Sequence, residues 1–256
     1  MHGLFHQPLP PGQNLAVVLQ VRDHGESDKI VTLYTRGLGK LASIAKGAKR
    51  SKKRFVNKLE PFSLLNVQLA TSRSSSLMRL DEAELLAPYP ALRQEYPQYL
   101  AATLLCELVL HWTREHDSDA ELFDLLTWAL SGLASGGEGR RTIAFFHIKL
   151  LEILGYRPSF DGCLDCGMLS AQKAPYRFSP LRNGLVCNSC EPAFSANSLP
   201  ISMQTVQLLR KAQDLAQDKL ERLRFSKGAL LETLALLRRY DSHLLQRELQ
   251  SWNFLC

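Results

Sequence analysis

The sequence of 256 residues contains no long apolar stretch, and no run approaches the roughly 18 apolar residues that a membrane-spanning helix requires. Its first 14 residues lack a basic start followed by an apolar segment, so we expect no secretory signal. We therefore expect a soluble, cytoplasmic protein without a membrane partner. Because most cytoplasmic thiols stay reduced, paired cysteines would indicate a metal site before a disulfide.

Motifs of common enzyme classes are also missing. There is no H-E-x-x-H and no G-x-S-x-G sequence. A phosphate-binding loop ending in Gly39-Lys40 would need glycine at position 34 and serine or threonine at position 41, where the chain has Tyr34 and Leu41. The seven histidines are scattered, and none pairs with a carboxylate at a telling spacing. We therefore expect a protein that is not an enzyme.

Charge is distributed unevenly along the chain, although the formal net charge is only +6. Between Asn14 and Leu80 there are 13 lysines and arginines against 4 acidic residues, whereas the rest holds 18 basic and 21 acidic residues. A basic segment on a slightly acidic body is typical of a module that binds a polyanion. A solvated basic face without a partner is the alternative interpretation of the charge alone.

Short β-rich bursts fill the first third of the chain. A link with two glycines, Thr35-Arg36-Gly37-Leu38-Gly39-Lys40, fits a hairpin. Five strands are expected, at about 15–19, 30–34, 41–45, 62–69 and 77–86. Five short strands in roughly 70 residues favour an OB-fold barrel, a common nucleic-acid platform, with an SH3-like barrel as the alternative.

The pattern becomes helical after Pro88 and Pro90 and is interrupted once, by a cysteine-containing insert. Apolar residues at helical spacing predict three helices before Gly155 and Pro158 and two helical stretches after the insert, near 202–223 and 227–250. The predicted fold class is α+β, an OB-fold barrel followed by a helical bundle that carries a four-cysteine zinc module. The expected divisions are an N-terminal extension at 1–14, the OB-fold domain at 15–87, helical parts at 88–159 and 196–256, and the insert at 160–195.

Four of the six cysteines form two C-x2-C pairs, Cys163 with Cys166 and Cys187 with Cys190, separated by twenty residues. Each such loop turns two thiolates toward one point, and two loops complete a tetrahedron around Zn²⁺. Gly167 follows the first pair, and residues 176–186 have the pattern of a hairpin that carries the second pair. We predict one structural zinc ion, because four thiolates leave no position for water. A metal-free loop and redox chemistry are the alternatives.

The densest cationic stretch runs from Lys46 to Lys58 and holds seven lysines and arginines. It follows the third predicted strand, so we expect an exposed loop whose cations neutralise phosphates with little sequence preference. Phe55 and Phe62 suit either base stacking or the core. The side chains expected to bind nucleic acid are Arg22, Lys40, Lys46, Lys49, Arg50, Lys52, Lys53 and Arg54.

Several local sequences together resemble the bacterial DNA repair and recombination family RecO. They are G-E-S-D-K at 25–29, G-K-L at 39–41, A-K-G-A-K-R at 45–50, L-E-P-F at 59–62 and L-G-Y-R-P at 154–158, followed by the four cysteines. The likeness runs from about Leu15 to Leu255. The N-terminal extension is longer than is usual in the family and carries no readable function.

The resemblance implies an N-terminal OB-fold, a helical domain and a zinc-binding insert. It also implies binding to single- and double-stranded DNA, annealing of complementary strands, and work at the nucleoid. RecR would be a partner in loading the RecA recombinase onto DNA coated by single-stranded-DNA-binding protein. Some relatives lack the cysteines, whereas this sequence has all four.

Two other functional classes stay open on the sequence. One is an RNA-binding or transcription-associated protein with OB and zinc-knuckle modules. The other is a protein-interaction adaptor in which the basic loop is incidental. A nuclease is less favoured, because the sequence has no carboxylate cluster with a metal geometry.

Overall fold

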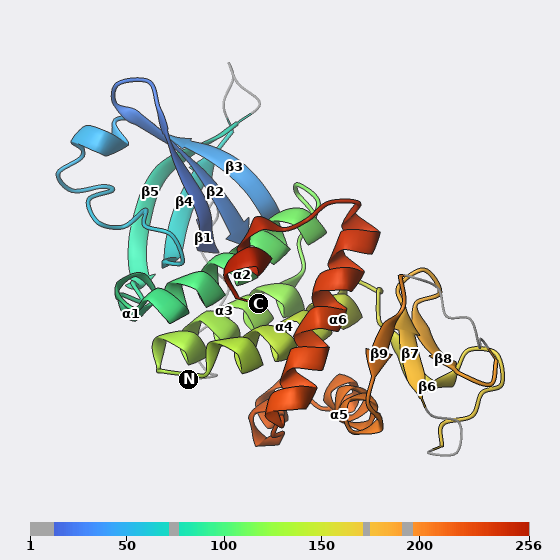
Figure 1. The fold of residues 1–256 in the computed structure, drawn as a ribbon. Helices are drawn as coiled ribbons and strands as arrows, with labels where there is room; N and C mark the ends of the chain where they lie inside the picture. The colour runs from blue at the N-terminus through green and yellow to red at the C-terminus, as the bar shows by residue number, and fades with distance from the viewer. Residues whose placement is uncertain (1–12, 72–76, 171–174, 191–196, 256) are drawn as a thin grey trace. The chain divides into compact units, whose positions relative to one another are not determined.

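The structure, a computed structural model, describes residues 13–71, 77–170, 175–190 and 197–255. The chain forms two compact units, one comprising Met1–Glu95 and Val109–Ala134, the other Tyr96–Leu108 and Ser135–Cys256. Figure 1 shows the helices and strands of both units. Among the residues described, no helix is both long and apolar enough to cross a membrane.

A closed barrel of five strands forms the first unit's main part, as the sequence predicted. Its strands are β1 (Gln13–His24), β2 (Asp28–Thr35), β3 (Gly39–Ala45), β4 (Leu64–Ala70) and β5 (Met78–Ala87). They pair in the order β1-β2-β3-β5-β4, with β3 and β5 parallel and β1 closing antiparallel on β4 (Figure 1). A five-stranded barrel of this topology is an OB-fold. The SH3-like alternative is therefore excluded.

Alternation of inward and outward side chains builds the barrel core. In β3, Leu41 and Ala45 are buried, while Ala42 and Ile44 between them lie half-buried on the outer surface. The inward side chains of all five strands form one apolar cluster, which also includes Phe55 and Leu59 from the connection between β3 and β4. That connection is therefore packed onto the barrel by its own apolar residues.

Helices α1 (Ala91–Gln94) and α3 (Ala120–Ala134) also belong to the first unit, together with the end of α2 (Tyr96–Trp112). The ring of Tyr34 on β2 lies 6.5 Å from that of Phe123 on α3, measured between centroids. Next to it, Arg36 forms two hydrogen bonds to Asp124, of 3.2 and 2.8 Å. These contacts join α3 to the hairpin of β2 and β3.

The second unit contains helices and a small sheet. The helices are the first part of α2, α4 (Gly139–Ile153), α5 (Met203–Asp214) and α6 (Lys227–Leu245), and the strands are β6 (Ser159–Cys163), β7 (Tyr176–Ser179), β8 (Gly184–Cys187) and β9 (Leu199–Ile201). The sheet order is β6-β8-β7-β9. The helical stretch predicted near 202–223 is not one helix, because the backbone becomes extended at Leu215 and a short 3-10 helix, Gln217–Arg222, follows.

The C-terminal residues are fixed by buried polar groups of the second unit. Trp252 donates from Nε1 to Asp241 at 2.9 Å, and His147 Nε2 lies 2.8 Å from the other oxygen of that carboxylate. Both His147 and Asp241 are almost fully buried. The spacing of the histidines in the sequence gave no sign of this pair, because Asp241 is far from His147 along the chain. This pair belongs to the core.

Candidate metal centre and nucleic-acid interface

The four cysteines of the insert come together at one point. Their sulfur atoms all lie within 4.8 Å of one another, and those of Cys166 and Cys187 are 3.9 Å apart. A tetrahedral ion with Zn–S distances of about 2.3 Å would place neighbouring sulfurs about 3.8 Å apart. Cys163 and Cys187 are buried, whereas Cys166 and Cys190 are exposed. The four sulfurs therefore fit a tetrahedral metal ion.

Tight turns bring the thiols into this position. Cys163 ends β6, and its carbonyl accepts a 2.8 Å hydrogen bond from the amide of Gly167, whose φ of +70° suits glycine. Cys187 ends β8, which pairs antiparallel with β7, so the hairpin predicted to carry the second pair is confirmed. The amide of Cys187 points at the sulfur of Cys163 from 3.4 Å. The two loops thus meet through main-chain contacts as well as through sulfur.

The pKa values of two of the four thiols, Cys163 and Cys190, are shifted in opposite directions. Burial raises the pKa of the Cys163 thiol, but the amides of Cys166, Cys187 and Asp165 outweigh burial and lower its pKa to about 6. The neighbouring sulfurs of Cys187 and Cys166 raise the pKa of Cys190 to about 12. Four thiolates at such short distances repel one another unless a cation lies between them. The donor set therefore matches a thiolate-binding cation.

The basic segment, residues 46–58, connects β3 to β4 across the surface of the barrel. It begins with the short 3-10 helix η1 (Ala48–Arg50). Ala48, Phe55 and Leu59 are buried in the barrel core, whereas the cations between them point to solvent. The apolar anchors thus hold the backbone of the segment, and its charged side chains are displayed outward.

Half of the predicted nucleic-acid ligands are exposed cations that form no ion pair with a described carboxylate. In the described part of the chain, no carboxylate lies within ion-pair distance of Arg22, Lys46, Lys52 or Lys53. Lys49 lies 3.1 Å from Asp23, and Arg50 lies 3.9 Å from Glu26. Both acids are largely exposed, so water and salt weaken these pairs. The segment is therefore only partly neutralised by the protein itself.

Arg54 has a different environment. Its guanidinium lies 4.9 Å from the centre of the Phe55 ring and donates to the carbonyl of Lys46 at 2.9 Å. Phe55 is only 3% exposed and Phe62 only 2%. Neither ring is open to a nucleobase, so core packing is the role that the structure supports for both. Arg54 thus stabilises the fold of the segment while keeping its charge at the surface.

Lys40 does not join the other predicted ligands. It lies at the opposite end of β3 from Lys46, and its amine donates to the carbonyls of Leu110, at 2.6 Å, and Thr113. Burial lowers the pKa of Lys40, partly opposed by Glu115. The amine satisfies carbonyl groups at the end of α2, which have no partner within the helix. We therefore leave Lys40 out of the nucleic-acid surface.

Replacing Lys40 by methionine tests this assignment. We expect Lys40→Met to lower the free energy of unfolding by about 1 to 3 kcal/mol, because buried carbonyls lose their donor, and to leave DNA affinity almost unchanged. Lys46→Met, just beyond the other end of β3, is the matched control. It should keep stability and weaken DNA binding about threefold at moderate salt. Urea unfolding and DNA titrations measure both quantities, and a Lys40→Met protein with normal stability and weaker DNA binding would contradict us.

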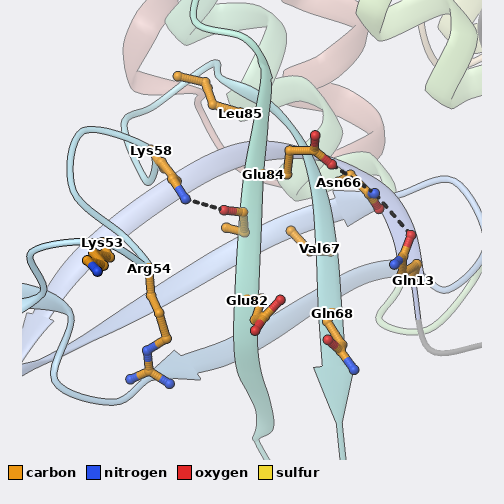
Figure 2. Close-up of a pocket in the computed structure, with 11 residues that line it drawn as sticks. Gln13, Lys53, Arg54, Lys58, Asn66, Val67, Gln68, Glu82, Glu84 and Leu85 are labelled. Carbon is orange, nitrogen blue, oxygen red and sulfur yellow. Dashed lines mark hydrogen bonds between the residues drawn. The ribbon is translucent and has the colours of Figure 1, made fainter.

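A groove of about 650 Å³ lies between the second half of the basic segment and the outer surfaces of β4 and β5 (Figure 2). Lys58 donates to the carbonyl of Ala83 at 2.8 Å, and Asn66 donates to Gln13 at 3.1 Å. The cations Lys53, Arg54 and Lys58 share the groove with Glu82 and Glu84. The groove is therefore mixed in charge.

Sequence reasoning missed Asp28, which contacts the basic segment directly. Its carboxylate accepts a 2.8 Å hydrogen bond from the amide of Gly47 and a 2.9 Å hydrogen bond from the hydroxyl of Ser27. Asp28 belongs to the G-E-S-D-K sequence, and Gly47 belongs to A-K-G-A-K-R. The presence of both motifs in one chain was the sequence signal that could have pointed to Asp28, since the structure brings the two motifs into contact.

Two family models match most of the chain. The one described as Recombination protein O N terminal covers residues 13–89, and the one described as Recombination protein O C terminal covers residues 93–253. A protein named DNA repair protein RecO from Syntrophus aciditrophicus (strain SB) is 35% identical over 239 residues, 93% of this chain and 92% of its own length. A relative of the same name from Syntrophobacter fumaroxidans (strain DSM 10017 / MPOB) is 33% identical over 94% of this chain and 95% of its own length. A third relative with that name, from Myxococcus xanthus (strain DK1622), is 34% identical over 94% of this chain.

Proposed function

Because this chain belongs to the RecO family of DNA repair proteins, we propose that it binds single- and double-stranded DNA and anneals complementary strands. The observation that carries the proposal is the row of exposed cations on an anchored segment of an OB-fold barrel. No described carboxylate lies within ion-pair distance of Arg22, Lys46, Lys52 or Lys53, so their charges are available to phosphates. The surface is completed by Lys49, Arg50 and Arg54.

Annealing by such a surface needs no covalent chemistry, and we propose a mediator rather than an enzyme. Two DNA strands repel through their phosphates, and a cationic surface lowers this repulsion. Because Phe55 and Phe62 are buried, their rings do not stack on the bases, and the surface can bind the DNA through its sugar–phosphate backbone. The bases then remain free to pair with a second strand. The same backbone contacts explain binding to both single and double strands.

We propose that the four cysteines hold one zinc ion with a structural role. Cys163, Cys166, Cys187 and Cys190 are the ligands, and four thiolates leave no coordination position for a substrate. The ion would hold together the two loops that follow β6 and β8. Residues 15–87 would then be the DNA-binding module and 160–195 the zinc module, and residues 88–159 and 196–256 would form the helical parts.

The partners that we propose follow from the family. They are RecR and single-stranded-DNA-binding protein, with RecA loaded indirectly. The setting would be the cytoplasm, at the nucleoid. A pull-down with RecR and with DNA coated by single-stranded-DNA-binding protein tests these partners directly.

A strand-annealing assay with a salt titration tests the function itself. We expect this protein to accelerate pairing of complementary oligonucleotides, and to retain this ability when single-stranded-DNA-binding protein coats them. About six cation–phosphate contacts should give a slope of log affinity against log salt near −4 on single strands. Tighter binding to RNA than to DNA would favour an RNA-binding role, and salt-insensitive partner binding without DNA affinity would favour an adaptor. Either result would overturn the proposal.

A further inference from the structure

The start of the basic segment is held against the turn between β1 and β2. The amide of Lys49 donates to the carbonyl of Ser27 at 2.9 Å, and the amine of Lys49 donates to the carbonyl of Gly25 at 2.9 Å. The methyl group of Ala48, between these contacts and the barrel, belongs to the core. These contacts fix the direction in which the segment leaves β3.

The turn that begins the segment is formed at Gly47. Its backbone is left-handed, with φ of +67° and ψ of 17°, a conformation that other residues adopt only with strain. Its amide donates to the carboxylate of Asp28, the first residue of β2. This hydrogen bond and that of Ser27 hold the pKa of Asp28 below its ordinary value, so the carboxylate is ionised at neutral pH. A charged acceptor makes a stronger hydrogen bond than a neutral one.

We propose that Asp28 is a positioning residue for DNA binding, because its carboxylate fixes the turn at Gly47 from which the cations of the basic segment are presented. The inference rests on the proposed function and adds a residue to it that does not itself touch DNA. A segment ordered in advance does not lose its conformational freedom when DNA binds, and this raises affinity. Without the contact, Lys46 and Lys49 would have to be ordered by the DNA.

Charge alone predicts that removing the carboxylate of Asp28 would tighten DNA binding, which is the opposite of what a positioning role predicts. Asp28 is an anion close to Lys46, which contributes to lowering its pKa. Removing its charge makes the protein more cationic by one unit, and charge alone would then tighten binding to a polyanion. A positioning role predicts weaker binding despite the more favourable charge. The sign of the change in affinity therefore separates the two explanations.

Three variants of the full-length protein distinguish the positioning role from an effect of charge alone. Asp28→Ala removes both the charge and the acceptor, whereas Asp28→Asn removes the charge and keeps an oxygen that can accept from Gly47. Asp23→Ala is the matched control, since Asp23 is an exposed carboxylate 3.1 Å from Lys49 that accepts no hydrogen bond from a main-chain amide of residues 46–58. Fluorescence anisotropy with a single-stranded oligonucleotide gives the dissociation constants at several salt concentrations.

We expect Asp23→Ala to bind DNA about twofold more tightly than the wild type, because Lys49 is freed. Asp28→Asn should stay within about twofold of the wild type. Asp28→Ala should bind about tenfold more weakly, and amide hydrogen exchange should become faster at residues 46–54 and stay unchanged in the barrel strands. Equal or tighter binding by Asp28→Ala would overturn the inference.

A fourth variant keeps the proposal testable if Asp28→Ala fails to fold. Gly47→Ala strains the same turn without changing charge, and the structure leaves space around that position. We expect about three- to fivefold weaker DNA binding from it, and unchanged affinity would overturn the inference on its own. If the wild type fails to bind the oligonucleotide at any salt concentration, the proposed function fails. If the wild type binds and both Asp28→Ala and Gly47→Ala bind equally well, only the role of Asp28 fails.

Discussion

Reversing four charges of the basic segment, with Lys49→Glu, Arg50→Glu, Lys52→Glu and Lys53→Glu together, is expected to weaken DNA binding by at least about 100-fold at 0.1 M salt. Each lost phosphate contact also lowers the salt dependence, so the slope of log affinity against log salt should flatten by about three on single strands. All four positions are exposed in this structure, and none supplies a side chain to the barrel core. The barrel should therefore fold normally, although Lys49→Glu removes the hydrogen bond between its amine and the carbonyl of Gly25.

Net charge itself is the main alternative explanation for such a loss, and the chain offers a matched control. Lys219, Arg222, Arg224 and Lys227 are four exposed cations in the second unit. Reversing these four charges changes the net charge by the same amount, and the four residues lie outside the barrel. We expect this control to lose less than about threefold in affinity at the same salt concentration. Equal losses of affinity in the two variants would mean that the basic segment has no special role in DNA binding. Unchanged affinity in the variant with four reversed charges in the basic segment would show that this segment is not part of the DNA interface.

Removing two ligands of the metal centre, with Cys163→Ala and Cys166→Ala together, is expected to abolish metal binding. Elemental analysis of the purified wild type should give about one zinc per chain, and the variant should contain none. Metal binding to small zinc modules contributes on the order of 10 kcal/mol to their folding, so residues 159–201 should lose hydrogen-exchange protection. We expect the melting temperature of the second unit to fall by about 10 °C.

A cysteine outside the cluster supplies the control for this experiment. Cys106 on α2 is 2% exposed and does not belong to the group of four clustered cysteines. Cys106→Ala should keep the full metal content and lose only about 1 kcal/mol of stability through the small cavity. Full metal content in the double variant would contradict the ligand assignment. Loss of the metal without any loss of protection in residues 159–201 would contradict the structural role of the ion.

Local spacing carried much of the information about the metal centre. A C-x2-C loop places its two sulfurs near each other through the geometry of a single turn, so Cys163 and Cys166 form half a site by themselves. The second half depends on β7 and β8 forming a hairpin, which the alternation in residues 176–186 predicted. Paired cysteines that could hold a metal ion are therefore among the features that a sequence specifies locally.

Contacts between residues that are distant in the sequence depend on the tertiary structure and could not be predicted from local spacing. The spacing of Lys40 on its strand gave no sign that its amine would meet the carbonyls of Leu110 and Thr113, so it was grouped with the exposed cations. His147 and Asp241 are likewise far apart in the chain and meet only in the folded second unit. A charged side chain looks the same in sequence whether it faces solvent or a carbonyl group, because its environment is supplied by other elements.

The sequence by itself determined the five strands of the barrel, the two cysteine pairs and the position of the basic segment, because each depends on periodicity, turn residues or charge density within a short stretch. Tertiary structure alone decided which aromatic rings enter the core, which cations stay free, and that Asp28 holds the turn at Gly47. These outcomes depend on how distant strands are brought into register, and the free energy of each contact is fixed by the burial and the partners that only the packed molecule provides.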